Sequence, residues 1–169
     1  MATRSLVRTI EKLEALAAQM RGTTRQVFER ALHDIRYSYG VSQFESLITA
    51  VCAERTGRPL NENELAARQE FWSVVKRECQ WGQIALPETC PPEILLAAAQ
   101  VTVFASYWNF QVARSGYDAA ERGQEPTEEQ LTALRELDAL NARLAELAGF
   151  DSVEEFNLCT ERAYAKGAR

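Results

Sequence analysis

Histidine, the side chain that most often binds metals and activates nucleophiles, is scarce in this chain of 169 residues. It has a single histidine, His33, so a zinc site built from histidines cannot form within one chain. Glu29 and His33 are four residues apart and would share a helix face, but the paired Glu-x-x-His motifs of di-iron bundles are absent from the sequence. We therefore predict no metal site and interpret His33 as a surface or helix-capping residue.

Cofactor and catalytic motifs are also missing from the sequence. It contains no glycine-rich nucleotide loop and no G-x-S-x-G elbow. A cysteine or serine nucleophile would need His33 as its base, and no local pattern brings such a pair together. A histidine-ligated haem would likewise have only His33 to use. We predict no catalytic residue and no cofactor, and we favour a protein that is not an enzyme.

The four cysteines are Cys52, Cys79, Cys90 and Cys159, and none forms a C-x-x-C pair. The N-terminal residues form an amphipathic, charged pattern that does not resemble a signal peptide. Both observations favour a reducing, cytoplasmic compartment. Cys79 and Cys90 bracket one short segment, and we interpret them as two partly buried thiols, with a redox-switched disulfide as the alternative.

The most apolar stretch of the chain, residues 91–117, has no charge between Glu93 and Arg114. It predicts a buried helix over about 93–114. At 100° per residue, Thr102, Ser106 and Asn109 form a polar stripe next to Tyr107. Buried polar groups need partners, so this stripe either meets a neighbouring helix, which we favour, or lines a pocket for a small ligand.

A second stripe of the same helix is predicted to reach water: Glu93, Gln100, Tyr107, Gln111 and Arg114. The uncharged stretch is long enough to cross a bilayer. Its amides and hydroxyls would be costly in hydrocarbon, so we predict no membrane span.

Two groups of side chains are candidates for an interface. Tyr37 and Tyr39 lie at a predicted helix turn, where aromatic residues form either a core corner or an interaction site. The net charge of −5 argues against nucleic acid as a partner. Negative charge is concentrated after residue 117, and we predict that a basic partner would be met by these side chains: Glu128, Glu129, Glu136, Asp138, Glu154 and Glu155.

Glycines and prolines fall at the breaks between helical patterns, and no hairpin signal occurs. The sequence therefore predicts one all-α domain over residues 1–169, a single compact bundle of six or seven helices around the central helix. The first helix is expected over residues 4–20. Capping-box patterns predict helix starts at Ser42, Asn61 and Thr127. The apolar connection after helix four, with Trp81, Ile84 and Leu86, is expected to fold back over the core.

These patterns favour a protein-binding adaptor, regulator or inhibitor that acts through a helical, partly acidic surface. The alternative is a helical small-ligand-binding protein or enzyme with its pocket on the stripe of Thr102, Ser106 and Asn109. A homodimer is a further possibility, formed through the first helix or through the leucine-rich helix that follows Thr127.

Overall fold

The computed structural model describes residue 11, residues 23–105 and residues 110–167. Within these ranges the chain forms seven α-helices, one π-helical segment and no β-strand. The all-α prediction is confirmed. The helix expected over residues 4–20 falls almost wholly outside the described residues.

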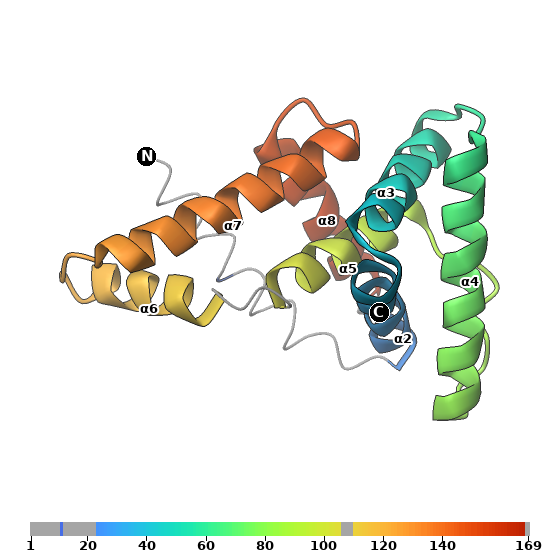
Figure 1. The fold of residues 1–169 in the computed structure, drawn as a ribbon, viewed down its shortest axis with the longest axis horizontal. Helices are drawn as coiled ribbons and strands as arrows, with labels where there is room; N and C mark the ends of the chain where they lie inside the picture. The colour runs from blue at the N-terminus through green and yellow to red at the C-terminus, as the bar shows by residue number, and fades with distance from the viewer. Residues whose placement is uncertain (1–10, 12–22, 106–109, 168–169) are drawn as a thin grey trace.

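Figure 1 shows how the helices are arranged. In chain order they are α2 (Thr23–Asp34), the π-helical segment η1 (Ile35–Tyr39), α3 (Val41–Thr56), α4 (Glu62–Gly82), α5 (Pro92–Ala105), α6 (Phe110–Glu121), α7 (Glu128–Leu147) and α8 (Val153–Gly167). The pair α6 and α7 lies on one side of α5, and α4 lies on the other side, outside α2 and α3.

Helix α5 is the central element of the fold. It packs against α2, α3, α7 and α8. Every residue from Leu95 to Gln100 is buried. A helix that is buried around its whole circumference must have neighbours on all sides, as the apolar stretch predicts.

The helix expected over 93–114 is divided between two elements. The structure describes α5 up to Ala105, and residues 110–114 belong to α6, which packs chiefly against α7. The difference has a basis in the side chains. Helix α6 buries Ala113 and Tyr117 on one face and exposes Gln111 and Arg114 on the other, so it suits an edge position.

The buried apolar side chains form two clusters. The larger joins α2, α3, α4, α5, α8 and the end of α7, and includes Phe71, Leu96 and Phe156. The smaller lies between α5, α6 and α7, and includes Phe104 and Leu137. Together they account for the buried faces that the helical periodicity predicts.

A group of buried polar side chains links three helices near the place where the two clusters meet. Gln100 on α5 donates through its Nε2 to Asn141 Oδ1 on α7 at 2.9 Å and to Asn157 Oδ1 on α8 at 2.8 Å. Thr160 Oγ1 on α8 lies 3.1 Å from Gln100 Oε1, the acceptor of this contact. We call these four residues the amide cluster. The expectation that Gln100 reaches water is wrong, because α7 and α8 cover that face of α5.

Two of the three predicted capping boxes are present. The side chain of Asn61 accepts from the backbone N–H of Glu64, and Thr127 accepts from that of Gln130, with the reciprocal bonds in both cases. The box predicted at Ser42 is wrong. Helix α3 begins at Val41, two residues earlier than a cap at Ser42 would place it. It follows Gly40, whose φ of +100° suits glycine, and no side chain caps it.

Ion pairs hold α3 against α4. Arg68 donates from Nε and Nη2 to the two carboxylate oxygens of Glu54, at 2.8 and 3.1 Å. Arg58 bonds both carboxylate oxygens of the buried Glu64. The hydrogen bond from Arg58 is the main reason why the pKa of Glu64 lies below its usual value. Bidentate pairs of this kind fix geometry as well as charge.

The longest helices are α4, with 21 residues, and α7, with 20. Both carry charged side chains along their length. None of the helices in the described ranges combines the length and the apolar character that a membrane span requires. This finding agrees with the prediction made for the apolar stretch.

The helix starts give a first testable prediction. Thr127→Ala should lower the free energy of unfolding by about 1 kcal/mol, because it removes the side-chain acceptor at the start of α7. Ser42→Ala should change it by less than about 0.5 kcal/mol, since Ser42 is exposed and does not cap α3. Urea unfolding followed by circular dichroism measures both. Equal losses in the two variants would contradict the assigned start of α3.

The amide cluster gives a second prediction. Gln100→Leu should lower the free energy of unfolding by about 1–3 kcal/mol, because it leaves Asn141 and Asn157 buried without the donor that they share. The matched control is Gln69→Leu, an exposed glutamine on α4, for which we expect a change below about 0.5 kcal/mol. A Gln100→Leu protein as stable as the parent would show that the cluster does not hold the helices together.

Candidate functional site

Exposed aromatic side chains mark one region of the surface. Trp81 at the end of α4 is 82% exposed, and Tyr37 and Tyr39 of η1 are 52% and 45% exposed. The expectation that Trp81 folds back over the core is wrong. It lies in the last turn of α4, one residue before the helix ends at Gly82, where neighbouring helices do not cover it. Of the connection that follows, Ile84 packs on the core, while Leu86 is half-exposed.

The two tyrosines are placed by a change of helix type. Helix α2 buries Val27, Ala31 and Leu32 and passes directly into the π-helical segment at Ile35, which is also buried. The segment then turns Tyr37 and Tyr39 to the surface. The segment ends at Gly40, so both tyrosines lie at the turn from α2 into α3.

A groove of about 420 Å³ lies between α2 and α4, beside these aromatic residues. Two ion pairs cross from α2 to α4 at this groove: Arg30 with Glu78, at 3.1 Å, and Asp34 with Arg77. The groove is lined by these four residues together with His33 and Trp81.

The aromatic residues are connected through the same groove. The ring of Tyr37 stacks on that of His33, with the centroids 4.6 Å apart, and His33 lines the groove opposite Trp81. Tyr39 interacts with Glu70 and Arg77 of α4. A hydrogen bond to the Glu70 carboxylate is the first cause that raises the pKa of the Tyr39 hydroxyl above its usual value. We call the set of Arg30, His33, Tyr37, Tyr39, Arg77 and Trp81 the aromatic face.

The aromatic face consists of paired charges and exposed rings. Its cations are paired with carboxylates, and its exposed area comes mainly from aromatic rings. Within the described ranges, no group of three histidine, cysteine, aspartate or glutamate side chains is placed to hold a metal ion. The face therefore offers contact area and hydrogen bonds to a partner.

Sequence patterns point to only part of this face. Tyr37 and Tyr39 are predicted as interface candidates, and both lie on it. Trp81, Arg30 and Arg77 are not predicted, because their role depends on how α2 packs beside α4. Helical phase gives no signal for Trp81, because it lies seven residues after the buried Val74 and so shares its side of α4.

The predicted acidic residues lie in two separate places. Glu128 and Glu129 occupy the first turn of α7, and Asp138 lies ten residues later, about 15 Å along the axis. Asp138 lies close to Glu154, at the start of α8. Its own burial, followed by the charge of Glu154, raises the pKa of Asp138. The full set, on α7 and α8, is Glu128, Glu129, Glu136, Asp138, Glu154 and Glu155.

The predicted polar stripe is only partly described. Thr102 is buried, and its hydroxyl donates to the backbone carbonyl of Ala98 within α5 at 2.9 Å. It therefore satisfies its hydrogen bond within its own helix. Ser106, Tyr107 and Asn109 lie outside the described residues.

The cysteines are free thiols, and Cys79 and Cys90 are both buried. Burial raises the pKa of Cys90 to about 12, so its reactive thiolate form is scarce at neutral pH. Burial also raises the pKa of Cys79. These properties agree with the interpretation of two thiols and disfavour the redox switch.

Comparison with known proteins finds no relative of this chain. No family model matches the chain, and no curated protein or solved structure is significantly similar to it. The function must therefore be argued from the side chains of the molecule itself.

The aromatic face gives a third prediction. Glu70→Gln should lower the pKa of Tyr39 towards its ordinary value of about 10, because a neutral amide disfavours the phenolate less than a carboxylate does. Arg77→Gln should move the pKa of Tyr39 in the opposite direction, because Arg77 stabilises the phenolate. Titration of the tyrosine Cζ resonances by NMR measures both changes. Shifts of the same sign in the two variants would contradict the contacts described for Tyr39.

Proposed function

We propose that the protein works by binding another protein, as an adaptor, regulator or inhibitor, and that the aromatic face is its main contact surface. The observation that carries this proposal is the exposure of Trp81, 82%, beside a groove that also holds His33 and two arginines. Tryptophan, tyrosine and arginine are the residues most enriched at the energetic centres of protein interfaces.

The composition of the aromatic face supports a protein partner. Fully burying an exposed, large apolar side chain contributes about 1.5–3 kcal/mol. Trp81 has most of such a contribution still to make, and the half-exposed Tyr37 and Tyr39 have part of it. The ion pairs Arg30–Glu78 and Asp34–Arg77 surround the rings with polar groups. An apolar centre with a polar rim is the usual composition of such an interface.

The face is also held in place by the core. The ring of Phe28 on α2 lies 6.1 Å from that of Phe71 on α4, and both side chains are buried in the larger cluster. A surface carried by packed helices loses little conformational freedom when it binds, which favours affinity.

The acidic side chains of α7 and α8 form the second part of the proposal. Exposed carboxylates such as Glu128, Glu129, Glu154 and Glu155 attract a basic partner during its approach and act mainly on the association rate. We propose that they steer the partner and that the aromatic face holds it.

A photo-crosslinking experiment tests this proposal and gives the fourth prediction. A benzophenone amino acid at position 37 should crosslink one partner protein in a lysate of the cells that make this chain. Trp81→Ala, in the same background, should weaken binding of that partner by at least about tenfold, because it removes an interface centre. Titration of the purified partner measures the loss.

The matched control is Leu65→Ala, which truncates a leucine on α4 that is 48% exposed and does not line the groove. We expect it to leave the affinity unchanged. Both variants should unfold within about 0.5 kcal/mol of the parent, since both positions are exposed. Equal affinity of the partner for the parent and for Trp81→Ala would overturn the proposal. A crosslink between two copies of the chain would replace the foreign partner with a homodimer.

A further inference from the structure

A second groove lies on another part of the molecule and has a different chemical character. It has a volume of about 810 Å³ and lies between α8, the start of α5, the end of α3 and Phe150. Its apolar surface comes mainly from Ile94, Phe150 and Leu158, and Leu158 is 49% exposed. Grooves of this size and apolar character are typical of small-molecule sites. We call it the α8 groove.

Arg55, near the end of α3, lines this groove, and not all hydrogen-bond donors of its guanidinium group have an acceptor. The group lies over the ring of Phe150, with its central carbon 4.1 Å from the ring centroid. Its Nη1 donates to the backbone carbonyl of Ala148 at 3.3 Å. Its Nε is buried and has no hydrogen-bond acceptor. A guanidinium carries five N–H donors, so Arg55 has donors left for a ligand.

The nearest carboxylate does not satisfy this donor. Glu93 Oε1 lies 3.8 Å from Arg55 Nε, which is close enough for charge attraction but too far for a hydrogen bond. The side chain of Glu93 is 45% exposed, so water screens it and it is able to turn outward. A buried donor without an acceptor is unfavourable, and an incoming carboxylate would remove that penalty.

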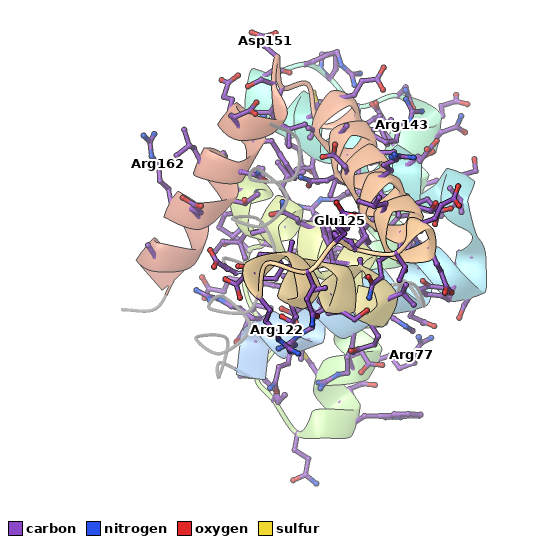
Figure 2. All side chains as sticks on the ribbon, turned by 90° about the vertical axis from the view of Figure 1, so that its left-hand side faces the viewer. Arg77, Arg122, Glu125, Arg143, Asp151 and Arg162 are labelled. Atoms are coloured by element: carbon purple, nitrogen blue, oxygen red, sulfur yellow. The ribbon has the colours of Figure 1, made fainter. Side chains whose placement is uncertain are left out.

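The remaining charges of the groove limit the kind of ligand. Glu93 and Glu155 balance Arg55 and Arg162 in number. Arg162 projects from α8 away from the body of the molecule, as Figure 2 shows, so it does not compete with Arg55 for a buried head group. With two carboxylates in its lining, the groove suits a single negative charge better than a phosphate dianion. A ligand ammonium group could not accept a hydrogen bond from Arg55, because both groups carry only donors.

We propose that the α8 groove binds a small amphiphilic carboxylic acid. The carboxylate accepts hydrogen bonds from Arg55, including that of the buried Nε, and displaces Glu93 towards solvent. The hydrocarbon body lies on Ile94, Phe150 and Leu158. Directional hydrogen bonds select the head group, and burial of the chain on these side chains provides affinity.

Isothermal titration calorimetry with octanoate tests this proposal and gives the fifth prediction. Octanoate should bind the full-length protein saturably with one site. Octan-1-ol and octylamine should bind at least about tenfold more weakly, because neither offers Arg55 a charged acceptor. Equal binding of octanoate and octylamine, or no saturable binding of octanoate, would overturn the proposal.

Variants locate the binding. Leu158→Asp should weaken octanoate binding by at least about tenfold, since it places a charge on the apolar side of the groove. Its matched control is Leu65→Asp, an equally exposed leucine on α4 that lies outside the groove, which should leave the affinity unchanged. Equal losses in the two variants would contradict the site.

Glu93→Gln gives an opposite and independent signature. It removes the carboxylate that competes for Arg55, so octanoate should bind more tightly to this variant than to the parent. Because Glu93 is half-exposed, the substitution should not affect folding, and circular dichroism checks this. Weaker binding by a folded Glu93→Gln protein would show that Arg55 does not receive the carboxylate.

Discussion

The arrangement of the three helices α5, α7 and α8 depends on the side-chain amide of Gln100. Its Nε2 donates to both Asn141 and Asn157, and Thr160 lies against its carbonyl oxygen. Hydrophobic burial is non-directional, so apolar contacts alone would tolerate several positions of α8 along α5. A buried amide group accepts only the position that satisfies it, since every other one leaves polar atoms without partners. The amide cluster therefore specifies one position of α8 along α5, whereas the apolar surface specifies only that the two helices are in contact.

The two candidate sites are built on different parts of this framework. The aromatic face belongs to α2, η1 and α4, which meet around Phe28 and Phe71 and are tied to α3 by the pair Arg68–Glu54. The α8 groove lies where α3, α5 and α8 converge, and its position depends on the amide cluster. Neighbouring residues of α3 serve both regions, because Glu54 binds α4 while Arg55 lines the groove. Helix α3 thus connects the two.

The sequence predicts the features that depend on local periodicity and misses those that depend on packing. The capping boxes at Asn61 and Thr127 form because the residue three positions later, Glu64 or Gln130, has a side chain that bonds back to the backbone N–H of the capping residue. At Ser42 the same pattern fails, since Gly40, at a positive φ, lets the helix start earlier. Gln100 has nearly the same helical phase as Glu93, whose side chain is half-exposed, and only the positions of α7 and α8 determine that Gln100 is buried. No local pattern carries that information.

The candidate sites also combine residues that a local pattern predicts with residues that only the packing of the helices reveals. Tyr37 and Tyr39 are recognisable because aromatic residues at a turn are unusual, whereas Arg55 resembles any arginine near a helix end. Trp81 shows why the distinction matters. Its position on α4 faces solvent, so a polar residue there would serve the fold equally well. An exposed tryptophan adds apolar surface and a risk of aggregation without stabilising the folded chain. The exposure of a residue that the fold does not need, and that water disfavours, is the feature on which the proposal of a protein partner rests.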